Sequence, residues 1–341
     1  MPVEGAIPHL EGIEMYGRSI PAGTAGGDLF EYINFQQRYD LDARIRRALH
    51  LSKEYLRAHQ IGAADHTPVD DQVAWLKTRP DFRPEMDAAY REARSLEQVR
   101  VAENLNDLYS TAGVLLVDAQ GHGLISAKIA STVHDTFHAF MLSELDRYGT
   151  TTPELFELTN LRLARSVTAR NALAEDSGGA REIATMLYGE VRPSGHFRFV
   201  NFGHPPPLVF SARDGKFREV DRDRMVQFLP LGLEVPEGYP DRTRYYSLHF
   251  RQRPADYADV AEITLFHSGD ILFLYTDGVY DGSDEEERRT LEALMRDICL
   301  LAAKDICHAV LEHAEGRDKV LRERGEEDLI DDKTVFVIKR S

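Results

Sequence analysis

The architecture can be read most directly from the segment ILFLYTDGV, at residues 271–279. Its first five residues are all apolar or aromatic, a pattern typical of a strand that is buried on both faces. The run ends in Asp277 and Gly278, so a carboxylate follows directly on a core strand. A carboxylate in this position is held rigidly by the strand and still reaches solvent.

Other aspartates occupy the same kind of position along the chain. Asp118 ends a second buried-type strand, Asp28 follows a glycine-rich turn, and Asp331 and its neighbour Asp332 precede the last predicted strand. Carboxylates that converge repel one another unless cations neutralise them. All-oxygen ligands favour hard ions, so this pattern points to Mg²⁺ or Mn²⁺ rather than Zn²⁺.

Strands and helices alternate around these aspartates. A helix is expected from the turn at Gly121 to about Tyr148, and a second one begins at Pro153. Two more helices are predicted between residues 285 and 324, and the predicted strands lie at 113–117, 183–191, 197–202, 271–275 and 334–338. Because tight turns join neighbouring strands, we expect antiparallel sheets with the helices packed outside them.

Composition excludes several classes of protein. The chain has 341 residues, 43% of them hydrophobic, which is enough for a large core. A net charge of −16 disfavours nucleic acid and anionic membranes as partners. No apolar run approaches the ~18 residues that a membrane span needs. Two cysteines, Cys299 and Cys307, and no signal peptide indicate a reducing, cytoplasmic location.

A block rich in Arg, Glu, Ala and Leu separates the first two aspartate segments. It runs from about Tyr39 to Tyr109, and its helical spacing places Ile45, Leu49 and Leu56 on one face. About 70 residues exceed an ordinary loop. We therefore predict a helical insertion at residues 36–110. One interpretation is a structural hairpin on the sheet edge, and the other is a regulatory, docking or dimerisation module.

Five short elements occur in order along the chain: GGDLFE at 26–31, DAQGHG at 118–123, NFGHPP at 201–206, LYTDGV at 274–279 and DDKT at 331–334. Together they resemble the motifs of the PPM (protein phosphatase 2C-like) family in its bacterial SpoIIE/RsbU branch. The chain departs from the pattern at Glu31, where the family has a second Asp, and at Phe202, where it has a small residue.

The resemblance implies an α+β fold, a four-layer αββα sandwich of two antiparallel sheets flanked by helices, formed by residues 1–35 and 111–341. It also implies two divalent cations, Mn²⁺ or Mg²⁺. Asp118 would bridge both ions, and the carbonyl of Ala119 would bind one of them. The remaining ligands implied by the resemblance are Asp28, Asp277 and Asp331, with Asp281 at a candidate third, weaker site.

The same resemblance implies a serine/threonine protein phosphatase. A water or hydroxide activated by the two metals would attack phosphorus directly, without a phosphoenzyme. The substrate would be a phosphoprotein of bacterial signalling, such as an anti-sigma-factor antagonist. The alternative is a weak or inactive phosphatase-like module that binds a phosphoprotein. A haloacid-dehalogenase type of enzyme is excluded, because Val279 and Tyr275 stand where that class needs a second Asp.

Histidines offer fewer signals. His122 is a candidate proton donor to the leaving alkoxide, with a helix-start or surface role as the alternative. His204 is expected to order its loop. His134 and His138 have the four-residue spacing of metal ligands on a helix, but the sequence identifies no third ligand. We therefore interpret that pair as a helix-surface or packing feature.

Overall fold

The computed structural model describes residues 7–60, 84–121, 123–173, 183–218, 227–233, 261–265, 267–280, 282 and 285–341. The chain divides into two compact units. The first, here called the sheet unit, comprises Met1–Asn34, Ser110–Phe140 and Pro153–Ser341. The second, here called the helical unit, comprises Phe35–Tyr109 and Met141–Thr152. No helix in the described part of the chain is long and apolar enough to cross a membrane.

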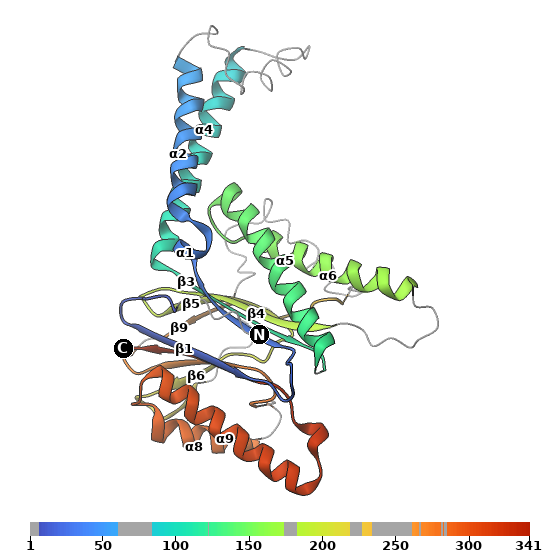
Figure 1. Ribbon diagram of the computed structural model, residues 1–341. Helices are drawn as coiled ribbons and strands as arrows, with labels where there is room; N and C mark the ends of the chain where they lie inside the picture. Colours follow the sequence, from blue (N-terminus) through green and yellow to red (C-terminus); the bar gives the residue numbers. More distant parts are fainter. Residues whose placement is uncertain are drawn as a thin grey trace. The chain divides into compact units, whose positions relative to one another are not determined.

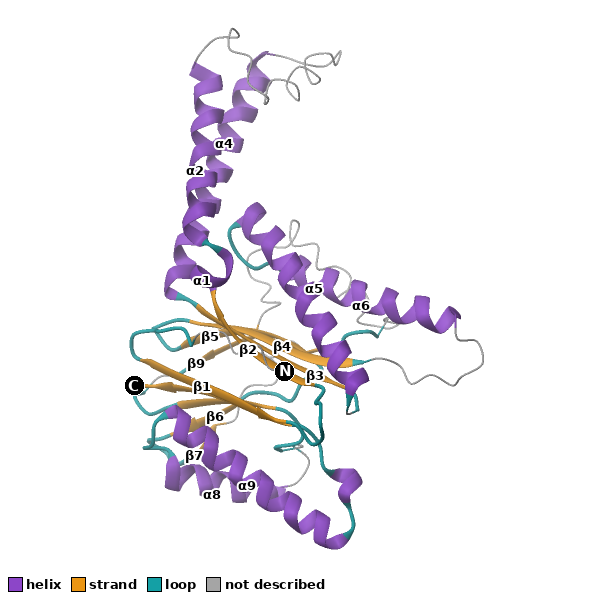
Figure 2. Ribbon diagram, in the orientation of Figure 1, coloured by secondary structure: helices purple, strands orange, loops and turns teal. Residues whose placement is uncertain are grey.

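Two sheets form the sheet unit (Figure 2). One has the strand order β1-β11-β10-β6-β7, and the other has the order β2-β3-β4-β5-β8 with β9 also paired to β5. Neighbouring strands are antiparallel apart from the short parallel pair β5–β8. The bounds are β1 Ile13–Ile20, β2 Asp28–Asn34, β3 Ala112–Ala119, β4 Ala184–Val191, β5 His196–Phe202, β6 Leu208–Ser211, β7 Lys216–Arg218, β8 Gln227–Phe228, β9 Ala261–Thr264, β10 Ile271–Tyr275 and β11 Lys333–Arg340.

Helices cover the outer face of each sheet, so the predicted αββα sandwich is confirmed (Figure 1). α8 (Glu285–Ile298) and α9 (Ala303–Arg324) lie against the first sheet, where α9 contacts β1 and β11. α5 (Leu124–Tyr148) and α6 (Pro153–Leu173) lie over the second. There Phe137 of α5 and Phe156 of α6 both pack on the ring of Tyr188 in β4.

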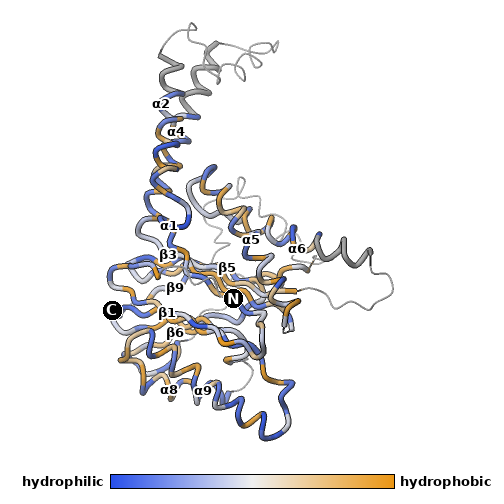
Figure 3. The backbone as a smooth tube through the Cα atoms, viewed as in Figure 1, coloured by the Kyte–Doolittle hydropathy of each residue, from blue (hydrophilic) through white to orange (hydrophobic). Residues whose placement is uncertain are grey.

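Strand β10 explains why residues 271–275 are all apolar or aromatic. Leu272 and Leu274 point between the sheets and join the core there, whereas Phe273 and Tyr275 point outward and pack under α8 and α9. Both faces are therefore buried, and hydrophobic residues recur along the strands of both sheets (Figure 3). β1 and β2, which flank the glycine-rich turn, do not pair with each other. They begin different sheets, so the turn crosses between layers.

The helical unit is built from α1 (Phe35–Tyr39), α2 (Leu41–Gln60) and α4 (Pro84–Asp107), followed by the short 3₁₀ turn η1 (Leu108–Ser110). α2 and α4 pack along each other, and the hydroxyls of Ser52 and Ser95 lie 2.9 Å apart between them. Leu49, which the helical pattern places on an apolar face, is 40% exposed. Residues 61–83 of the predicted insertion lie outside the described residues.

Candidate metal and active site

The centre of the candidate site is a pair of aspartates on adjacent strands. Asp28, the first residue of β2, is paired directly with Asp118 near the end of β3. Directly opposed residues point to the same face of a sheet, and here that face is the one between the two sheets. Burial raises the pKa of Asp28 well above its ordinary value, and the charge of Asp118 raises it further. The two carboxylates therefore repel each other in the absence of cations.

Asp277 and Asp331 approach this pair from the other sheet. Asp277 follows the end of β10 and Asp331 precedes β11, and both side chains are exposed. Burial raises the pKa of Asp118 to about 7, and Asp277, Asp331 and Asp332 raise it in turn through their charges. The structure thus brings together the four aspartates that the sequence predicts, at the end of the sandwich where both sheets contribute a strand end.

Two threonines orient Asp28. The hydroxyl of Thr276 donates to Asp28 Oδ2 at 2.8 Å, and the hydroxyl of Thr334 donates to the same oxygen at 2.7 Å. Both threonines belong to the opposite sheet, and the backbone N–H of Thr334 donates to Thr276 Oγ1 at 2.8 Å. These hydrogen bonds favour the ionised carboxylate and partly oppose the rise in its pKa. They fix one oxygen of Asp28 toward the second sheet.

Asp332 has a structural role at the glycine-rich turn. Its carboxylate is 3% exposed and accepts backbone N–H groups from Ala22 at 2.6 Å and from Gly27 at 2.5 Å. Gly27 in turn lies so close to β3 that an added Cβ would come 2.5 Å from the carbonyl oxygen of Ala119. Only glycine fits this approach. Asp332 and Gly27 therefore set the position of Asp28 relative to Asp118 and Ala119.

Helix α9 holds both aspartate turns of the other sheet, a feature that the sequence analysis did not find. Arg317 donates to the backbone carbonyls of Gly278 and Val279, next to Asp277. Lys333 Nζ lies 2.6 Å from the carboxylate of Asp318 and donates to the carbonyl oxygen of Asp331 at 2.8 Å. The charged residues Arg317 and Asp318 on α9 give no such signal in the sequence, because surface helices carry charged residues routinely.

A cleft of about 970 Å³ adjoins Asp277 and Asp331. α8 and α9 form much of its wall, with Glu286, His313 and Arg317 among the lining residues. The cleft opens beside the two aspartates. Its volume is large enough to receive part of a peptide chain.

The remaining predicted site residues have different outcomes. His122 and Asp281 lie outside the described residues. His204 is buried, and its Nδ1 lies 2.8 Å from the hydroxyl of Thr185. Asn201 holds the His204 backbone through hydrogen bonds to both its N–H and its carbonyl oxygen. Burial lowers the pKa of His204 to about 3, so this side chain is neutral and orders its loop, as expected.

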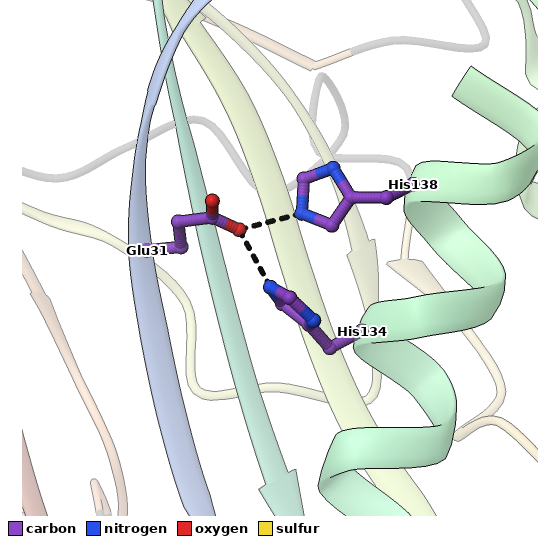
Figure 4. Close-up of side chains that lie close together, drawn as sticks. All are labelled: Glu31, His134 and His138. Atoms are coloured by element: carbon purple, nitrogen blue, oxygen red, sulfur yellow. Dashed lines mark hydrogen bonds and ion pairs between the residues drawn. The ribbon is translucent and has the colours of Figure 1, made fainter. Parts of the chain in front are cut away.

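A second cluster was missed by the sequence analysis. His134 and His138 of α5 both point at Glu31 of β2, whose Oε2 lies 2.8 Å from His134 Nε2 and 2.5 Å from His138 Nε2 (Figure 4). The pair was interpreted as a helix-surface or packing feature. A surface position is wrong, because all three side chains are buried, whereas a packed position agrees with the structure. A signal was present in Glu31, one of the two departures from the family pattern.

Among the described residues, this cluster is the one place where at least three potential metal ligands have donor atoms within 4.8 Å of one another. The aspartates are spread more widely. That spread suits two ions rather than one, because paired metal ions in phosphatases stand roughly 3.5–4 Å apart and need ligands on both sides.

Comparison with known proteins identifies the family. The family model described as Stage II sporulation protein E (SpoIIE) matches residues 110–341. The chain belongs to the SpoIIE family. The family comprises PPM-type serine/threonine phosphatases, and dependence on Mn²⁺ or Mg²⁺ is general among them. A search of curated proteins finds no match to this chain.

Comparison with solved structures shows a similar fold. This SpoIIE-family chain matches the RsbU and RsbW domains of Rv1364c from Mycobacterium tuberculosis at 19% identity and a TM-score of 0.51, covering 98% of this chain and 61% of that one. It also matches the SiaA-PP2C domain of Pseudomonas aeruginosa, with 12% identity, a TM-score of 0.49, and coverage of 96% and 86%. The chain thus spans less than two thirds of the M. tuberculosis chain.

Proposed function

We propose that this chain is an active, metal-dependent protein phosphatase that hydrolyses phosphoserine or phosphothreonine on a bacterial signalling protein. The observation that carries the proposal is the convergence of Asp28, Asp118, Asp277 and Asp331 at one end of the sandwich, with raised pKa values on the buried pair. Carboxylates whose charges are so unfavourable together are the donors that divalent cations stabilise.

The donor set fits Mn²⁺ or Mg²⁺, because every proposed ligand is an oxygen. Asp28, Asp118, Asp277, Asp331 and the carbonyl of Ala119 would hold two cations, and Asp281 would serve a third, weaker site. When bound, the cations would supply an activated water and neutralise charge on the phosphoryl group.

The chain's own residues supply positioning. Thr276 and Thr334 orient Asp28, while Asp332 fixes the glycine-rich turn before it. Arg317 and Lys333 hold the turns that carry Asp277 and Asp331. The adjoining cleft would receive the peptide on either side of the phosphorylated residue. His122 is proposed as a proton donor to the leaving alkoxide.

The proposed partner is a phosphoprotein of a signalling pathway, such as an anti-sigma-factor antagonist. Its support is the SpoIIE family itself and the RsbU and RsbW domains that occur together in the similar M. tuberculosis structure. A cytoplasmic location is proposed with it, because Cys299 and Cys307 are both buried free thiols.

The purified chain is expected to hydrolyse p-nitrophenyl phosphate and a phosphoserine peptide with Mn²⁺ or Mg²⁺, and EDTA is expected to abolish the activity. Asp118→Asn and Asp277→Asn should each lower kcat/KM by roughly 100-fold or more, because each removes charge from the metal ligands. Asp297→Asn, which changes an exposed carboxylate on α8, is the matched control and should leave the rate unchanged.

Two results would contradict the proposal. Full activity of Asp118→Asn would show that the aspartate cluster is not the active site. A wild-type chain that binds the phosphopeptide without hydrolysing it, at any Mn²⁺ concentration, would identify the alternative, a phosphoprotein-binding module.

A further inference from the structure

We propose that Glu31, His134 and His138 form a second metal site, separate from the aspartate cluster, and that it binds Zn²⁺. The proposal does not depend on phosphatase activity. It rests on three observations: two histidines one helical turn apart, a carboxylate that faces both, and burial of all three side chains.

The first element is the convergence of donor atoms. Both histidines present Nε2 to the same oxygen of Glu31, and the three donor atoms lie within 4.8 Å of one another (Figure 4). In a tetrahedral zinc site with bonds of about 2.0–2.2 Å, neighbouring donors stand about 3.3 Å apart. The observed separations of 2.8 and 2.5 Å reach that value with side-chain shifts of less than about 1 Å.

The second element is the partner of the other ring nitrogen of His134. Its Nδ1 lies 3.2 Å from Oδ1 of Asp135. A histidine that binds a metal through Nε2 commonly donates its Nδ1–H to a carboxylate, which fixes the ring and strengthens the ligand. His134 therefore already has the outer contact that a metal-bound imidazole uses.

The third element is burial. Glu31, His134 and His138 are 1%, 6% and 8% exposed. The ring of Phe137, itself fully buried, packs edge-on against His138 with the ring centroids 5.3 Å apart. A carboxylate in such surroundings is costly unless it is paired, and a cation between it and the two imidazoles compensates its charge directly.

The donor chemistry selects the ion. Two imidazoles and one carboxylate suit Zn²⁺, whereas Mg²⁺ prefers oxygen ligands alone. The two clusters of this chain are therefore chemically distinct. Asp28 and Glu31 also lie three residues apart on β2, so their side chains point to opposite faces of the strand. Water would complete the coordination in the fourth position.

The experiment uses the full-length chain, stripped of metal and held in excess Mg²⁺ so that the aspartate cluster is occupied. Titration with Co²⁺, a spectroscopic substitute for Zn²⁺, should give the visible absorption of a four-coordinate ion with one equivalent per chain. Zn²⁺ should remove that absorption by competition, and it should raise the Tm of the wild type.

His138→Gln is the decisive variant, because the glutamine amide can still donate a hydrogen bond to Glu31 while the metal ligand is lost. It should weaken Co²⁺ binding by at least about 100-fold and abolish the Tm shift with Zn²⁺. His196→Gln is the matched control. His196 also lies beside a glutamate, with Nε2 3.3 Å from Glu262, but on the surface, and its loss should change neither measurement.

Glu31→Gln serves as the second variant if His138→Gln does not fold. Diffraction from wild-type crystals soaked in Zn²⁺, measured at the zinc absorption edge, should give an anomalous peak between the three side chains. The proposal is overturned if the wild type gives no Co²⁺ absorption in Mg²⁺, or if a folded variant binds as tightly as the wild type. In either case the cluster is a hydrogen-bonded packing contact.

Discussion

At the scale of single residues, His204 shows how burial can set a protonation state. Its side chain is 1% exposed, and desolvation lowers its pKa to about 3 from an ordinary 6.5. Between these two values the unfolded chain binds a proton that the folded chain does not. The stabilisation due to neutral His204 is therefore fully present above about pH 6.5 and is lost as the pH falls toward about 3.

As the pH is lowered, the free energy of unfolding should therefore decrease more steeply in the wild type than in His204→Gln. Between about pH 6.5 and about pH 4.5, the wild type should lose roughly 2–3 kcal/mol more unfolding free energy than His204→Gln. Urea denaturation at a series of pH values measures it. His50→Gln, which removes an exposed histidine of α2, should keep the wild-type slope. Parallel curves for His204→Gln and the wild type would mean that His204 titrates normally.

At the scale of elements, the contact between α9 and β11 depends on a buried ion pair. The side chains of Lys333 and Asp318 are 3% and 7% exposed, and their charged atoms lie 2.6 Å apart. Lys333 also donates to the carbonyl oxygen of Asp331. Removing one partner of a buried pair leaves a charge without compensation, which is far more costly than removing both.

Lys333→Met should lower the free energy of unfolding by about 3–5 kcal/mol, because Asp318 is left buried and charged. The double variant Asp318→Leu/Lys333→Met should recover most of that loss. Urea denaturation of the two single variants and the double variant gives the coupling energy. Arg289→Met removes an ion pair whose side chains are 80% and 82% exposed, so it should have little effect. A double variant as unstable as Lys333→Met would disprove the account.

Elements were easier to predict from the sequence than contacts between them. The apolar run at 271–275 and the helix beginning at Pro153 are confirmed, because burial on both faces and a proline at a helix start leave local patterns. Arg317 and the Glu31–His134–His138 cluster were missed. Glu31 and His134 are separated by 103 residues, and a local sequence pattern cannot predict a contact between residues so far apart. The four aspartates were predicted because they stand at strand ends and turns, and because the family motifs include the same residues.

At the scale of the whole molecule, the helical unit is proposed to act as a regulatory, docking or dimerisation module. Two polar contacts show that its parts pack together. Arg44 of α2 pairs with Asp146, and Asn104 of α4 donates to the carbonyl oxygen of Tyr148 at 2.8 Å. The end of α5 therefore belongs to this unit together with α2 and α4. The insertion predicted at 36–110 did not include that segment.

Replacing residues 40–107 with a short glycine-containing hairpin should leave a folded phosphatase domain, since a shorter loop costs little entropy. The shortened protein should differ from the full chain in its Mn²⁺ requirement or in its solution mass, because the insertion lies between the segments that carry Asp28 and Asp118. Rate measured against Mn²⁺ concentration and light scattering test both. If the two proteins agree in both respects, the insertion is structural decoration.

Strand β2 constrains how this protein can evolve. Its alternate residues serve two different purposes, since Asp28 faces the other sheet and Glu31 faces α5. Inserting or deleting one residue between them would move every side chain beyond that point to the opposite face of the strand, so Glu31 would no longer face α5. Substitutions can change either site alone. A change in length within this segment would alter both together, so its length is expected to be inherited unchanged.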